Sequence, residues 1–179
     1  TDEAGLDTLV DVLLPLAGAL DQVCRVAESL DLHEKILAMT QQSGSSMAVE
    51  VEEALAISLL NVGGWGNNRR ALRMLLHVRE IRESEGHHDE TLSSTYASLG
   101  EAHRNCGRAA EAETFYRKAV ALQLRVPERR TTFQTLALQH QLFCILGYQK
   151  KYEEARHIYD EVYPDVKRLL GPGHSVTRS

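Results

Sequence analysis

The residues best suited to metal chemistry in this sequence are His87, His88, Asp89 and Glu90, which follow one another directly. Imidazole and carboxylate groups are common zinc ligands. Consecutive residues of a loop point in different directions, however, and no further ligand accompanies these four at a defined spacing. We therefore interpret the segment as a solvated loop between helices, in which Asp89 caps the helix that follows.

A second candidate for chemistry is the pair His103 and Cys106, one helical turn apart, which could form a thiolate–imidazole pair. We favour a structural interpretation, with His103 at a packing position and Cys106 in a turn. The sequence contains no G-x-S-x-G, P-loop or G-x-G-x-x-G motif. The glycine-rich stretch 63–66 lacks the lysine and the preceding strand of a phosphate site, so we expect Trp65 to anchor a turn. These observations predict a protein that is not an enzyme and has no cofactor and no metal.

Composition sets further limits on function. The 179 residues are 43% hydrophobic and 25% charged, as in soluble globular domains, and the net charge of -5 argues against nucleic acid as a partner. The short basic runs at 69–70 and 129–130 fit solvated helix ends. No apolar run approaches the length of roughly 18 residues that a membrane span needs, and the first residues are acidic, unlike a signal peptide. We therefore expect a cytoplasmic protein without membrane insertion, and the missing initiator methionine suggests an excerpt of a longer chain.

The three cysteines, Cys24, Cys106 and Cys144, are widely spaced and form no C-x-x-C pair. Neither a disulfide framework nor a zinc site is indicated. We expect small core or groove thiols in a reducing compartment.

The elements that position these side chains should be almost entirely helical, because apolar residues recur at spacings of three and four. The dipeptide Glu111–Ala112 recurs 43 residues later at Glu154–Ala155, and each copy is followed by a tyrosine, Tyr116 or Tyr159. A weaker copy starts at Ala71. Such a period predicts stacked helical hairpins, with helices at about 47–62, 68–84, 90–105, 109–125, 129–147 and 151–169.

The first 45 residues hold enough apolar periodicity for one more helical pair, a degenerate repeat or cap, in which Pro15 should kink or shorten the first helix. Its expected apolar residues are Leu9, Leu13, Leu16, Leu20, Val23, Val26, Leu30 and Leu37. The predicted organisation is a pair at 1–45, repeats at 46–86, 87–127 and 128–171, and a loop or tail at 172–179.

Small residues in the second helix of the middle repeat indicate a close helix crossing. Backbones that approach to about 8–10 Å leave room only for Ala or Gly at the contact. We predict that Ala112 and Ala119 occupy such positions, that Tyr116 fills the space beside them, and that Glu113 faces solvent.

These residues resemble the tetratricopeptide repeat (TPR) family, and the match is best over 93–127, where His103 replaces the usual tyrosine. The loop segments 86–91 and 169–177 look like those of the kinesin light chain type, with its longer repeats. The third repeat departs from the pattern at Phe143, where a small residue is expected, and at Pro164, which interrupts its second helix; the first departs at Leu59. The resemblance, over 46–177, implies an all-α, right-handed superhelical array of antiparallel helix pairs, a TPR-like solenoid. It assigns packing roles to Tyr96, Leu99, Gly100, His103, Ala112, Tyr116, Ala119, Ala155 and Tyr159.

The family usually acts as a protein-interaction scaffold, so the resemblance implies that the concave face binds a peptide or helix of another protein. In the family register this face presents Ser94, Ala97, Ser98, Glu101, Asn105, Ala137, His140, Gln141, Cys144 and Tyr148. The basic and amide donors that clamp chaperone tails are absent from these positions, as are the paired asparagines of kinesin light chains at Ala97 and Ser98. We therefore expect shape and apolar contact to dominate, with His140 and Tyr148 as polar anchors.

Two other functions fit the same sequence. The segment could be a structural module that self-associates or joins domains of a larger assembly. It could also be a regulatory sensing domain attached to a larger protein.

Overall fold

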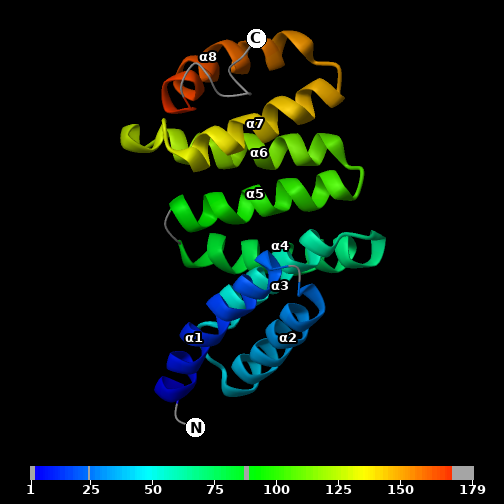
Figure 1. Ribbon diagram of the computed structural model, residues 1–179, viewed down its shortest axis with the longest axis vertical. Helices are drawn as coiled ribbons and strands as arrows, with labels where there is room; N and C mark the ends of the chain where they lie inside the picture. Colours follow the sequence, from blue (N-terminus) through cyan, green and yellow to red (C-terminus); the bar gives the residue numbers. More distant parts are fainter. Residues whose placement is uncertain (1–2, 24, 87–88, 171–179) are drawn as a thin grey trace. The chain divides into compact units, whose positions relative to one another are not determined.

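The computed structural model describes residues 3–23, 25–86 and 89–170. The chain divides into two compact units, Thr1–His87 and His88–Ser179. Within the described residues the first unit contains α1 (Glu3–Gln22), α2 (Val26–Ser43), α3 (Ala48–Val62) and α4 (Trp65–Glu85). The second contains α5 (Asp89–Asn105), α6 (Ala109–Leu124), a 3-10 turn η1 (Pro127–Arg129), α7 (Phe133–Tyr148) and α8 (Tyr152–Leu170). The fold is all-α, as predicted, and successive helices form antiparallel pairs joined by short turns (Figure 1).

The six predicted repeat helices are all present, and most of their ends agree within a few residues. The largest difference lies at α7, which begins at Phe133 because residues 127–129 form a separate 3-10 turn. Thr132 caps α7 by accepting a hydrogen bond from the backbone N–H of Thr135, at 3.3 Å. The Thr135 hydroxyl in turn donates to the Arg129 carbonyl at 2.7 Å, which ties the turn to the helix.

The two prolines do not end the helices that contain them. α8 runs through Pro164, so the expected interruption of this helix is wrong. α1 runs through Pro15, so of the two effects expected there, a kink or a shortening, the shortening does not occur. A proline removes one backbone hydrogen bond and clashes with the preceding turn, but the turns on either side can keep their bonds and the helix continues.

The predicted apolar stripe of the N-terminal pair agrees with the structure only in part. Leu13 and Leu37 pack against the core of the first unit, but other predicted residues do not. The buried side chains of α1 are Leu6, Val10 and Ala17, whereas Leu9 and Leu16 are exposed. The sequence of α1 is apolar around most of its circumference, so the spacing of leucines alone allowed two different faces. The buried residues of α2 are Ser29, His33, Ile36 and Thr40, and Val23, before it, is exposed.

Polar groups form part of the core of the first unit. The Nδ1 atom of buried His33 lies 3.0 Å from the Ser29 carbonyl and 3.4 Å from Ser58 Oγ. The Ser58 hydroxyl donates to Asp21 at 2.5 Å. Burial lowers the pKa of His33, although the Ser29 carbonyl and the charge of Asp21 oppose this shift. The folded unit therefore favours the neutral imidazole.

The small residues of the middle repeat lie at a close contact between α5 and α6. Gly100 of α5 packs under the ring of Tyr116, and a Cβ atom at Gly100 would lie 2.7 Å from two ring carbons. Ala112 and Ala119 are fully buried, and the Ser93 hydroxyl donates to the Ala119 carbonyl at 3.0 Å. Tyr116 itself is only 2% exposed, and burial raises its pKa to about 12.

Glu113 is buried, contrary to the prediction that it faces solvent; its side chain joins α6 to the turn before α8. It is 8% exposed and accepts hydrogen bonds from Arg117 at 2.9 Å and Lys151 at 2.7 Å. Burial alone would raise the pKa of Glu113, but hydrogen bonds from Lys151, Arg117 and Gln149 lower it overall. A glutamate in an amphipathic helix is normally exposed, and this one is an exception because Lys151, distant in sequence, pairs with it in addition to Arg117 on the same helix.

Candidate partner-binding surface

The ten residues predicted to bind a partner, here called the predicted binding face, are all at least partly accessible to solvent. On α7, Ala137, His140, Cys144 and Tyr148 are exposed and Gln141 is half-buried. The five on α5 are all half-buried: Ser94, Ala97, Ser98, Glu101 and Asn105. The face is accordingly small and polar on α5 and more open, with larger side chains, on α7.

One pocket lies where the end of α5 and the start of α6 meet α7. It has a volume of about 340 Å³ and is lined by Arg104, Gly107, Ala109, Cys144, Ile145 and Tyr148. Arg104 was not among the predicted residues, although the family register places it beside two of them. Its guanidinium donates to Glu101 at 3.2 Å, so the pocket holds one cationic donor that is already partly neutralised.

The structure brings together a thiol and an imidazole that the sequence did not pair. Cys144 Sγ lies 3.6 Å from His140 Nε2, one turn away on α7. In the pair considered from the sequence, His103 is instead buried, and its ring stacks on Phe115 at 5.2 Å between centroids. Cys106 is half-buried, and Cys24 lies outside the described residues.

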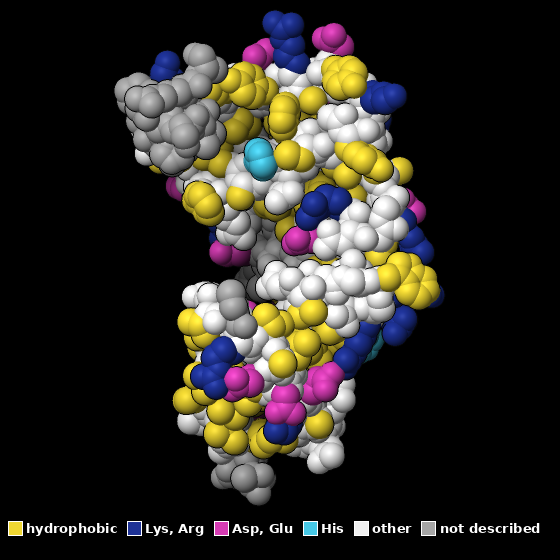
Figure 2. Space-filling model, turned by 45° about the vertical axis from the view of Figure 1, so that its right-hand side comes forward, with side chains coloured by type: hydrophobic (Ala, Val, Ile, Leu, Met, Phe, Trp, Pro, Cys, Tyr) yellow, Lys and Arg dark blue, Asp and Glu magenta, His cyan; other side chains and the backbone are white. Residues whose placement is uncertain are grey.

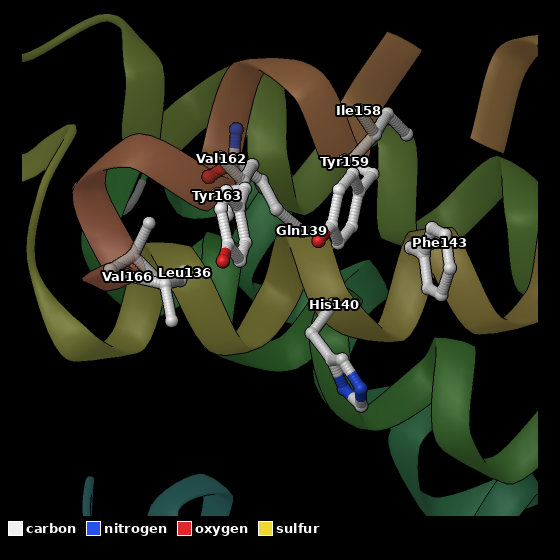
Figure 3. Close-up of a pocket in the computed structure, with 9 residues that line it drawn as sticks. All are labelled: Leu136, Gln139, His140, Phe143, Ile158, Tyr159, Val162, Tyr163 and Val166. Carbon is white, nitrogen blue, oxygen red and sulfur yellow. The ribbon is translucent and has the colours of Figure 1, made fainter. Parts of the chain in front are cut away.

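A second pocket opens between α7 and α8, with a volume of about 260 Å³ and a mostly apolar lining (Figure 3). The rings of His140, Phe143, Tyr159 and Tyr163 form a continuous row, with neighbouring centroids 6.4, 6.3 and 5.0 Å apart. Hydrophobic side chains gather over α7 and α8 in the upper part of Figure 2. The other lining residues are Leu136, Gln139, Ile158, Val162 and Val166. Apart from His140, none of these belongs to the predicted binding face.

Tyr159 differs from the other residues to which the resemblance gave packing roles. It is 43% exposed and lines the pocket, whereas the remaining eight are buried: Tyr96, Leu99, Gly100, His103, Ala112, Tyr116, Ala119 and Ala155. One repeat earlier, Tyr116 packs directly on Gly100. The position 43 residues after Gly100 is Phe143, whose ring contacts Tyr159 instead. A large side chain thus stands where a glycine would let Tyr159 pack down, and a surface pocket results.

Three other expectations concern individual residues outside this surface. Trp65 is 74% exposed, so it does not anchor the turn before α4, which is made by Gly63 and Gly64 at positive φ. Asp89 is the first residue of α5, and its carboxylate accepts a hydrogen bond from Arg125 at 3.3 Å. His87 and His88 lie outside the described residues.

In residues 3–23, 25–86 and 89–170, no group of three or more His, Cys, Asp and Glu residues could hold a metal ion. No helix in the same ranges combines the length and the apolar character needed to cross a membrane.

Two segments of the second unit match the model of a known repeat family. Residues 92–126 and 135–175 match the family model described as tetratricopeptide repeat. These two segments of the second unit therefore carry the sequence pattern of this repeat. The matched segments correspond to α5–α6 and α7–α8 together with residues that follow α8. No curated protein sequence matches this chain.

Solved structures show the same fold over nearly the whole chain. A putative kinesin light chain from Podosopora anserina, with nearly identical TPR-like repeats, aligns with a TM-score of 0.78 at 20% identity, over 94% of this chain and 80% of that one. BtubC (BKLC) from P. vanneervenii aligns with a TM-score of 0.79 at 17% identity, over 97% of this chain and 69% of that one. A Rap protein complexed with competence and sporulation factor aligns with a TM-score of 0.74 at 18% identity, over 90% of this chain and 43% of that one. At these identities the similarity shows the fold, a TPR-like solenoid of the kind found in kinesin light chains.

Proposed function

We propose that this chain is a non-catalytic scaffold whose second unit binds a peptide or helix of a partner protein on the predicted binding face and the adjoining α7–α8 pocket. The observation that carries the proposal is the apolar pocket between α7 and α8, with His140 at its edge. The fold is compatible with this role, because a Rap protein with a similar fold is complexed with competence and sporulation factor.

The pocket suits an anchoring side chain better than a whole small ligand. Its volume of about 260 Å³ is below the range of about 300–1,000 Å³ typical of small-molecule sites. Burying one Leu, Ile or Phe side chain of a partner would contribute about 1.5–3 kcal/mol. At the α7–α8 pocket, this argument supports a side chain of a protein partner over a whole small molecule.

Polar groups beside the pocket would orient the partner. The exposed side chains of His140 and Tyr148 can each exchange hydrogen bonds with a bound backbone, and Arg104 adds one donor. That guanidinium is already paired with Glu101, so a carboxylate would gain little of the roughly 1.5–3 kcal/mol that a hydrogen bond to a charged group provides. We keep the expectation that acidic chaperone tails are not the partner, and we place the interaction in the cytoplasm, where free thiols such as that of Cys144 stay reduced.

A peptide display library tests this proposal. Peptides selected on the purified chain should bind saturably in calorimetry, and Tyr159→Ser should weaken them at least about tenfold through loss of the apolar contact. Tyr152→Ser is the matched control, because Tyr152 is an exposed tyrosine of the same helix that lies outside the pocket. Circular dichroism serves as the check that both variants are folded. Selected peptides that are weakened equally by both variants, or not at all, contradict the proposed site.

Self-association is the second candidate function, and the apolar residues of α8 that remain partly accessible at the pocket favour it. The side chains of Tyr159, Val162, Tyr163 and Val166 line one open pocket and could pack against a second copy. Light scattering coupled to size exclusion separates the two functions. A monomer at all concentrations supports the binding scaffold, whereas a concentration-dependent dimer that Tyr163→Ser abolishes supports self-association.

A further inference from the structure

Helix α4, in the first unit, carries an exposed aromatic and basic stripe that neither the core nor the predicted binding face uses. Trp65, Arg69 and Arg73 are spaced four residues apart and share one face of the helix. Trp65 is 74% exposed, and the guanidinium carbon of Arg69 lies 4.6 Å from the centre of its ring. This cation–π contact holds both side chains at the surface in a defined arrangement.

The charge around the stripe is unusual for this protein. The chain has a net charge of -5, yet residues 65–78 contain three arginines and no acidic residue. Arg70 pairs with Glu34 at 2.6 Å, whereas no described carboxylate lies within ion-pair distance of Arg69 or Arg73. Dark blue basic side chains gather near mid-height at the right-hand edge of Figure 2.

Helix stability does not account for these arginines. The first turns of a helix carry a partial positive charge, so acidic side chains stabilise them and basic ones do the opposite. The first turn of α4 contains no acidic residue, and Arg69 and Arg70 follow it directly. An exposed tryptophan adjoins them, and Trp and Arg are the residues most enriched among those that dominate binding energy in protein interfaces.

We propose that Trp65, Arg69 and Arg73 form a docking site for an extended acidic segment of a partner protein. Guanidinium groups bind carboxylates through paired hydrogen bonds, and the Trp65 ring offers a flat apolar contact. Side chains four residues apart on a helix are separated by about 6 Å along its axis. Alternate side chains of an extended segment are about 6.6 Å apart. The matching sequence is therefore an apolar residue followed by acidic residues at the second and fourth positions after it.

Trp65 itself reports binding, because it is the single tryptophan of the chain. The probe is a short synthetic peptide with a leucine followed by glutamates at those two positions and serines elsewhere. Its titration should give a saturable change in tryptophan fluorescence that weakens as salt is added. The same peptide with glutamines in place of glutamates should give no saturable change.

Variants locate the site. Arg69→Gln and Arg73→Gln should each weaken binding about two- to fivefold, and the double variant more. Arg156→Gln is the matched control, because Arg156 is an exposed helical arginine of the second unit. Tyr159→Ser should also have no effect, so failure of this site and failure of the proposed α7–α8 site are distinguishable.

Two results overturn the proposal. One is equal binding of the glutamate and glutamine peptides, or no binding of either. The other is tighter binding of single-stranded oligothymidylate than of the glutamate peptide, which would assign the aromatic and basic stripe to nucleic acid.

Discussion

Replacement of Gly100 by alanine should destabilise the second unit, even though alanine normally stabilises a helix. The added Cβ atom would lie 2.7 Å from both Cδ1 and Cε1 of Tyr116. Non-bonded carbon atoms prefer separations of about 3.5–4.0 Å, so the overlap is about 0.8–1.3 Å. The Tyr116 ring is 2% exposed and has little room to retreat.

Two opposing contributions set the size of the effect. Overpacking a well-filled core costs about 1–3 kcal/mol, and two contacts this short at a buried ring belong at the upper end. Alanine recovers about 1 kcal/mol relative to glycine in a helix interior. We expect a net loss of about 1–2 kcal/mol in the free energy of unfolding, measured by urea denaturation and circular dichroism.

Gly147→Ala is the matched control, because Gly147 is also helical and a Cβ atom there would meet no atom within 4 Å. It should leave stability unchanged or raise it by up to about 1 kcal/mol. In a Tyr116→Leu background the penalty of Gly100→Ala should shrink, since the clashing ring is gone. A Gly100→Ala protein as stable as the Gly147→Ala protein would refute the packing argument.

Three further predictions use the same denaturation assay. Ala112→Leu should cost about 1–3 kcal/mol by overpacking, whereas Glu111→Leu, at the exposed neighbouring position, should change little. Lys150→Gly should stabilise by about 0.5–1 kcal/mol, because Lys150 adopts a left-handed backbone (φ 62°) that favours glycine, whereas Lys150→Ala keeps the strain. The pKa of His33 is lowered by folding, so the unfolded chain takes up a proton first as pH falls below about 6.5, and the free energy of unfolding should decrease there. That decrease should disappear in His33→Asn; a pH profile identical to that of the unmodified protein would contradict the assignment.

The helices and their order were predictable because periodicity and turn residues are local signals. The tight turns of the α3–α4, α5–α6 and α7–α8 hairpins show how regular these signals are. The backbone has a positive φ at Gly64, Gly107 and Lys150, which follow one another at intervals of 43 residues. Glycine marks the first two turns in the sequence. The third turn has lysine at this position and so carries no glycine signal in the sequence, although its backbone adopts the same left-handed conformation.

Burial was harder to predict wherever a helix offered two plausible faces or a polar residue found a distant partner. The leucine spacing of α1 fitted one face, but packing selected the face that contains Leu6 and Val10. Glu113 is buried because Lys151, far along the chain, reaches its carboxylate. Neither outcome follows from the sequence of a single helix, because both depend on what the neighbouring element presents.

The α7–α8 pocket shows how one substitution in a repeated framework can create a surface. With Gly100 in α5, Tyr116 packs down and closes the crossing of its hairpin. With Phe143 at the corresponding place in α7, the equivalent Tyr159 stays 43% exposed and joins a row of rings beside an open pocket. The departure from the family pattern at Phe143 was visible in the sequence, but its consequence depended on where the displaced tyrosine would lie. A position where a repeat loses its small residue is therefore the place to look for a binding surface, because the framework around it remains intact while the local packing changes.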